Sequence, residues 1–112
     1  MYRIGGNKHM QLQIKTVTKN AIGEQITSWE TLQRITGWLD LQAGDSKYTT
    51  YDAKIQESTH IFISDYVPLA LGITAETSRA VIDGVTYDIM LIDNPMGMNQ
   101  QLEIYLKYTG GQ

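Results

Sequence analysis

The sequence contains no cysteine, which excludes disulfide bonds, thiolate metal sites and cysteine nucleophiles. Lysine and arginine together number nine of 112 residues and are dispersed along a chain whose net charge is −3. This charge pattern argues against a basic surface for nucleic acid. No apolar run approaches the length of a membrane span, and the opening residues MYRIGG lack the apolar segment of a signal peptide. We therefore expect no membrane span and synthesis in a cytoplasm.

The remaining composition is typical of one globular domain. Hydrophobic residues make up 42% and charged residues 19% of the chain, whose length suits a single core. We predict one β-domain over residues 10–108. A flexible N-terminal arm over residues 1–9 should precede it, and a flexible tail over residues 109–112 should follow.

The strongest local signal is a hairpin. Asp83-Gly84 separates two apolar runs and predicts a type I′ turn, because both central positions of that turn need positive φ. A two-residue turn fixes the register, so Arg79 should lie opposite Asp88 as a pair of opposite charge. Period-two alternation then predicts a buried face made of Ala80, Ile82, Val85, Tyr87, Ile89 and Leu91.

Alternation also indicates strands elsewhere, over residues 11–19, 26–41 and 55–66. The second of these is long for a flat strand, so we expect a bulge or sharp bend near Gly37. A final strand should place four residues inward, namely Leu102, Ile104, Leu106 and Tyr108. In the strand over 55–66, we assign Ile61 and Ile63 to the inner face and His60, Phe62 and Ser64 to the other. Two aromatics are still expected to pack in the core, Trp29 and Phe62.

Five or six strands with tight turns predict an all-β fold, either a small antiparallel barrel or a sandwich. Closure into a barrel would hide the edges of the sheet. Residues 42–54 are polar and interrupt the pattern, which predicts a long mobile loop of a kind that is usually functional or disordered. Residues 48–56 also fit helical spacing, so a short helix is the alternative there. Residues 67–76 form a connector, with or without one helical turn.

No set of residues converges on catalysis or metal binding. His9 and His60 are far apart, and no spacing of His, Asp and Glu supports a metal site or a general base. We therefore expect no enzyme activity, no metal and no cofactor. The residues that suit a partner interface are Trp38, Met96 and Met98, because methionine adapts to varied surfaces; ordinary loop packing is the alternative for the methionines. Exposed aromatics would also suit an OB-like binder of single-stranded nucleic acid.

The order and spacing of several motifs resemble the head-tail adaptor, or head-closure, proteins of long-tailed bacteriophages. The resemblance covers most of residues 10–108 and departs at Ser64-Asp65-Tyr66, where many members carry an arginine before the aromatic. The motifs that carry it are Gly23, Trp29, WLD at Trp38–Asp40, ESTHIFI at Glu57–Ile63, Tyr66, IT at Ile73-Thr74, RxVIDGxxYDI at Arg79–Ile89 and LEIYLK at Leu102–Lys107.

This resemblance implies a structural virion protein that closes the DNA-filled head. It implies a homo-oligomeric ring of about twelve copies, monomeric when free, that binds an upper adaptor or portal ring and a tail-completion protein. It also implies that the 42–54 loop faces double-stranded DNA in the channel through Asp45, Lys47, Tyr48, Tyr51, Asp52 and Lys54. The alternative is another neck or tail-terminator component.

Overall fold

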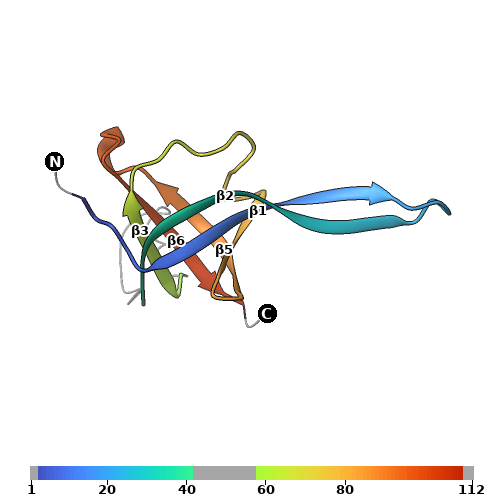
Figure 1. Ribbon diagram of the computed structural model, residues 1–112, viewed down its shortest axis with the longest axis horizontal. Coiled ribbons are helices and arrows are strands. Elements are labelled where there is room, and N and C mark those ends of the chain that lie inside the picture. The colour runs from blue at the N-terminus through green and yellow to red at the C-terminus, as the bar shows by residue number, and fades with distance from the viewer. Residues whose placement is uncertain (1–2, 42–57, 110–112) are drawn as a thin grey trace.

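The computed structural model describes residues 3–41 and 58–109, which form a closed antiparallel barrel (Figure 1). Neighbouring strands follow the order β1-β2-β3-β6-β5-β4, and β4 returns to β1. The expected all-β barrel is confirmed. Within the described residues, no helix is long and apolar enough to cross a membrane. The elements are β1 (Lys8–Lys19), β2 (Gln25–Leu41), β3 (His60–Asp65), β4 (Ser78–Ile82), β5 (Val85–Asp93), the 3₁₀ turn η1 (Pro95–Gly97) and β6 (Gln101–Tyr108).

Side chains from every strand fill the barrel interior. Phe62 of β3 is fully buried at its centre, and the connector after β3 packs against the same cluster through Tyr66 and Val67. Burial of so many aliphatic groups is the main force that closes the barrel, since each is worth about 1.5–3 kcal/mol. The other core residues are Met10, Leu12, Ile35, Ile73, Ala80, Ile82, Tyr87, Ile89, Leu102, Ile104 and Leu106.

The β4–β5 hairpin has the predicted turn and register. Asp83 and Gly84 both have positive φ, at 52° and 78°, and Arg79 lies opposite Asp88. Two expectations are wrong. Among the described residues the ion pair within 4.0 Å joins Lys8 to Asp83, and Arg79 turns to other partners. A bulge between Ile89 and Leu91 also shifts the phase, so that Ile92 rather than Leu91 packs against the core.

In β3 the predicted faces are reversed. Phe62 and Ser64 are fully buried, while Ile61 and Ile63 are half-buried on the outer face. The reason is the space beside Gly37 of β2, where a Cβ would lie 2.8 Å from the Phe62 ring. The ring fills the volume that a side chain at Gly37 would need. Three consecutive apolar residues give no phase by themselves, so alternation could not choose the face.

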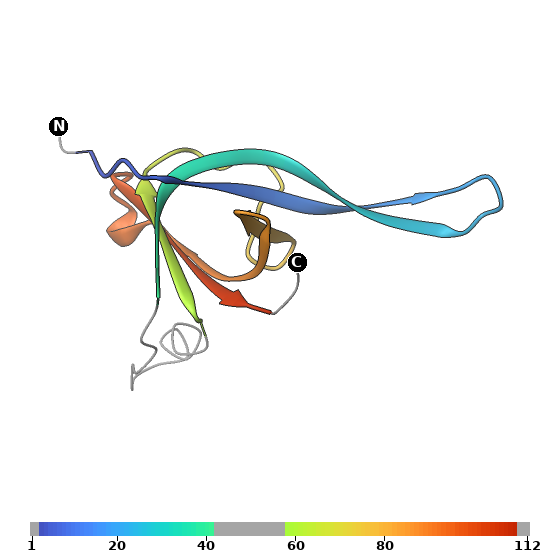
Figure 2. The ribbon, with the colours of Figure 1, turned by 60° about the horizontal axis from the view of Figure 1, so that its bottom comes forward.

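The β2 strand passes from one neighbour to another at Gly37, which pairs with Lys8 of β1 and with Ser64 of β3. Of the two alternatives expected near Gly37, a bulge or a sharp bend, the bulge lies elsewhere: the register shifts opposite Leu12 and Gln13, which leaves Leu32 as the extra residue. Because of this extra residue, Leu32 and Ile35 both pack against the core although strict alternation would place them on opposite faces of β2. The strand curves strongly in Figure 2 where it leaves β1.

The chain ends also differ from expectation. β1 begins at Lys8, so the part of the predicted N-terminal arm that is described includes the start of a strand. The 3₁₀ turn η1 lies after β5, whereas the connector over 67–76 contains no helical turn. In β6 the predicted inward residues are buried, except Tyr108, which is 44% exposed. Tyr105, on the opposite face of β6, is buried and was not predicted.

The hairpin of β1 and β2 continues far beyond the barrel (Figures 1 and 2). Pairing of β1 with β4 ends at Ile14, and pairing of β2 with β3 begins at Gly37. We call residues 15–30 the extension. It gives the molecule a longest dimension of 52 Å. At its tip the Asn20 side-chain carbonyl accepts hydrogen bonds from the amides of Ile22 and Glu24, both at 3.0 Å.

Candidate functional site

The described residues contain no cluster of three or more His, Cys, Asp or Glu side chains that could hold a metal ion. His9 pairs with the hydroxyl of Thr36 at 3.0 Å. His60 contacts Thr59 at 2.8 Å and meets the Tyr87 ring edge-on at 5.1 Å. His9 on β1 and His60 on β3 therefore have different partners and do not form a joint site. The surface features that stand out are instead the extension and two grooves.

The base of the extension is fixed by a polar and aromatic cluster. Arg79 of β4 lies over the Trp29 ring, 4.2 Å from its centroid, and its Nε donates a 2.8 Å hydrogen bond to the side chain of Gln13. Gln13 donates in turn to the Thr31 hydroxyl. This cluster joins β4 of the barrel to β1 and β2 where the extension begins. It also corrects the prediction for Trp29, which is 37% exposed and belongs to this cluster rather than to the core.

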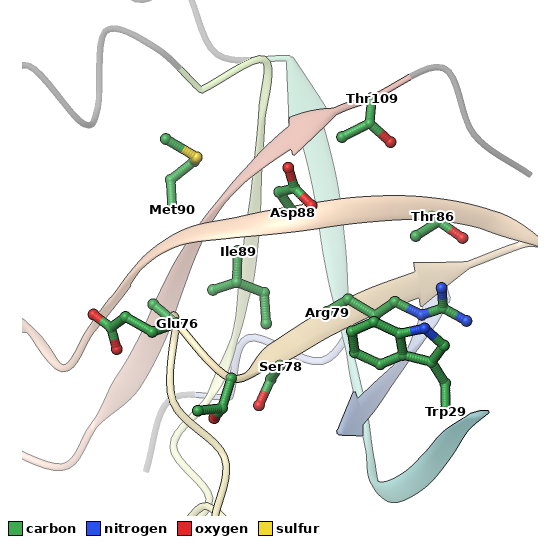
Figure 3. A pocket seen from close by; sticks show the side chains of 11 residues that line it. Trp29, Glu76, Ser78, Arg79, Thr86, Asp88, Ile89, Met90 and Thr109 are labelled. Carbon is green, nitrogen blue, oxygen red and sulfur yellow. The ribbon is translucent and has the colours of Figure 1, made fainter. Parts of the chain in front are cut away.

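A groove of about 610 Å³ opens beside that cluster (Figure 3). Its walls come from β4, β5 and the base of the extension, and Thr109 after β6 closes one side. Trp29 and Met90 supply apolar surface, whereas Glu76 and Asp88 supply carboxylates. Figure 3 shows Arg79 lying across Trp29, while Asp88 lies on β5 in the same lining. This mixed lining suits a protein segment better than a small metabolite.

A second groove, of about 820 Å³, lies at the end of the barrel away from the extension. The N-terminal segment forms one wall, because the amides of Ile4 and Gly5 donate to the Asp65 carboxylate at 2.8 and 3.0 Å. These two hydrogen bonds, from Ile4 and then Gly5, lower the pKa of Asp65 below its ordinary value of 3.8. The Trp38 indole donates to the Ile4 carbonyl at 2.9 Å. Asp65 thus holds the segment that borders the groove.

The predicted partner residues lie around this end. Trp38 is 44% exposed and donates a hydrogen bond to Ile4, which lines the groove. Met96 and Met98 are 91% and 56% exposed, in the turn that leads into Asn99 of the groove wall. Met96 has a positive φ of 55°, an unusual conformation for a side chain of this size. These three exposed apolar side chains therefore occupy one end of the molecule.

The sequence matches one family of known proteins. The sequence profile described as phage head completion protein matches residues 2–107, nearly the whole chain. The chain belongs to the phage head completion protein family. As a member of it, the protein is a structural component of the virion.

A solved structure supports the fold. The described fold resembles that of a chain from the "Virion of native gene transfer agent (GTA) particle", with a TM-score of 0.55 and 11% sequence identity. The alignment covers 89% of this chain and 91% of that chain. At this identity the likeness shows a shared fold. No curated protein sequence matches the chain.

The predicted channel residues lie outside the described part of the head completion protein. They are Asp45, Lys47, Tyr48, Tyr51, Asp52 and Lys54. The described residues on either side of that segment are nevertheless placed. Leu41 ends β2 opposite His60, which begins β3, so both ends of the segment lie side by side at one rim of the barrel.

Sequence reasoning missed the extension. The signal that could have found it is the lack of an apolar face: between Lys15 and Thr31, threonine and serine fall on both faces of the strands. Strands of 12 and 17 residues are also far longer than the usual five or six. A long hairpin without an inner face cannot lie against a core, so it must project.

Proposed function

We propose that this head completion protein closes the phage head after DNA packaging and joins the portal or upper adaptor ring to the tail-completion protein. The family match over residues 2–107 is the observation that carries this proposal. A homo-oligomeric ring of about twelve copies requires two different surfaces on each subunit, because a closed heterologous ring uses unlike patches. The extension and the end groove lie on opposite sides of the barrel, so we assign the extension to contacts between copies and the groove end to the adjoining proteins.

The role is structural rather than catalytic in this proposal. Its support is the family, whose description is that of a head completion protein. Trp38, Met96 and Met98 are proposed to contact the ring above or the protein below. Their common position at one end of the barrel favours a single neighbouring protein for all three.

The segment over residues 42–54 is proposed to face the DNA channel through Asp45, Lys47, Tyr48, Tyr51, Asp52 and Lys54. Its two aspartates and two lysines cancel in charge, within a chain whose net charge is −3. DNA must move through a neck, and each lysine or arginine that contacts a phosphate raises affinity for the backbone. A weakly charged or acidic lining therefore keeps the DNA mobile.

Electron microscopy of particles that lack this protein tests the proposal. We expect filled or leaking heads without tails, and purified protein added back should restore tails. Tailed particles of normal appearance in its absence would contradict the proposed role. Sedimentation of the purified chain tests the assembly state: the free subunit should be monomeric, and a stable large oligomer without any partner would contradict docking on a preformed ring.

A further inference from the structure

The extension has two open backbone edges. Among the described residues, β1 has no strand partner other than β2 beyond Ile14, and β2 has none other than β1 before Gly37. An unpaired edge presents a row of free N–H and C=O groups that can bind another strand. The β2 edge over residues 25–31 contains no Pro, Gly or Lys, and its one charged residue is Glu30.

Beyond the Arg79–Trp29 contact at its base, the extension exposes apolar side chains on its faces. Val17, Ile22 and Ile26 are 53%, 79% and 46% exposed. A two-stranded hairpin without a third strand or a covered face is only marginally stable in water. The sequence nevertheless keeps a regular register from Ile14 to Lys19, with a well-formed turn at Asn20. Such a segment is suited to pairing with a further strand in an assembly.

The two edges complement each other in direction. β1 runs outward and β2 returns. When two copies point the same way, the β2 edge of one lies beside the β1 edge of the next as an antiparallel pair. Repetition of this contact is heterologous, so it can continue around a closed ring.

The two edges also complement each other in charge. The β1 side carries Lys15 and Lys19, whereas Glu24 precedes β2 and Glu30 lies in it; all four are exposed. Attraction between unlike edges acts over about 8 Å at physiological ionic strength, so it does not need particular contact pairs. Pairing of two β2 edges would instead bring carboxylates together, which disfavours a two-fold dimer.

We propose that the extensions of neighbouring copies pair edge to edge, β2 of one copy with β1 of the next, into a continuous antiparallel sheet around the ring. This inference rests on the ring proposed above. The occupant of the open β2 edge is therefore a second copy of this chain, recognised by backbone hydrogen bonds and by its opposite edge charge. Side chains of the neighbouring strand then contact Val17 and Ile26 as cross-strand neighbours.

Charge exchange at the edges tests this pairing. Particles that lack the protein are supplied with purified full-length chain, and tailed particles are counted by electron microscopy. One variant is K15E/K19E, which makes both edges acidic, and another is E24K/E30K, which makes both basic. Lys107→Glu, an exposed reversal on β6 of the barrel, is the matched control. Thermal unfolding of each variant confirms that the barrel is intact.

We expect each double variant alone to restore tails at least about tenfold less well than the wild type, because like charges then meet at every contact. An equimolar mixture of the two should restore tails, since acidic and basic edges alternate around the ring. The control should act like the wild type. Restoration by each folded variant alone would overturn the inference and leave the proposed function standing. Failure of the mixture would also overturn it, in favour of a different protein on these edges. Wild-type chain that restores no tails would overturn both.

Discussion

The guanidinium of Arg79 lies 4.2 Å from the centre of the Trp29 ring, which ties β4 of the barrel to the base of the β1–β2 extension. Arg79 also donates to Gln13 on β1. One side chain therefore contacts Trp29 of the extension and Gln13 of β1, just before β1 leaves the barrel. This contact joins the base of the extension to the barrel.

A double-mutant cycle measures that contact. Trp29→Ala and Arg79→Ala, alone and together, should give a coupling free energy of about 0.5–1 kcal/mol in denaturant unfolding, as expected for a half-exposed cation–π pair. Trp38→Ala with Arg79→Ala is the control, because Trp38 contacts Ile4 instead, and it should be additive. Additive free energies for Trp29 with Arg79 would show that the stacking contributes nothing to stability.

Phe62 tests the orientation of β3. Phe62→Ala should lower the free energy of unfolding by about 3–5 kcal/mol, because it leaves a large cavity at the centre of the barrel. Ile63→Ala, on the outer face, should cost clearly less. Chemical denaturation of the two variants compares them directly. A larger loss for Ile63→Ala would mean that the strand faces the other way.

Gly37 tests the crossing of β2 from β1 to β3. Gly37→Ala places a methyl group against the Ile63 carbonyl and 2.8 Å from the Phe62 ring. Overpacking of this kind should cost about 1–3 kcal/mol, seen as a lower denaturation midpoint at unchanged slope. Asp40→Ala, exposed on the same strand, serves as the control. Wild-type stability of Gly37→Ala would show that the barrel corner has room to spare.

Asp65 gives a pH dependence of known sign. The amides of Ile4 and Gly5 lower the pKa of Asp65 in the folded state. The ionised Asp65 side chain therefore contributes its full stabilisation at pH values above 3.8, the ordinary pKa of an aspartate. This stabilisation is lost as the pH falls through the lower pKa that Asp65 has in the folded protein. The midpoint of thermal unfolding, Tm, should fall in that acidic window, and less so in Asp65→Asn.

Hydrogen exchange adds a local readout for the same residue. Asp65→Asn should increase amide exchange at Ile4 and Gly5 at neutral pH, because the carboxamide offers a single acceptor oxygen. Asp88→Asn, which changes an exposed carboxylate on β5, should leave both amides protected. Unchanged exchange at Ile4 and Gly5 in Asp65→Asn would mean that Asp65 does not hold the N-terminal segment.

Prediction from sequence succeeded where the signal was local. The Asp83-Gly84 turn requires positive φ at two adjacent positions, and this requirement alone set the register from Ile82–Val85 to Arg79–Asp88. Prediction failed where pairing with a neighbouring strand decides which side chains point into the core. The bulge between Ile89 and Leu91 depends on pairing with β6, so the alternation that predicted Leu91 inward could not see it. The exposed positions of Trp38, Met96 and Met98 agree with an interface, and their role there stays a prediction.

The sequence by itself determined the class of the fold, its tight hairpin and the family, because turn chemistry and the order of motifs lie within short stretches of chain. Only the tertiary structure decided which face of β3 is buried, where the bulges lie and that residues 15–30 leave the barrel. Each of these depends on volume and hydrogen-bond partners supplied by strands distant in sequence. Gly37 makes room for Phe62, and the strands that could have covered the extension end at Ile14 and begin at Gly37.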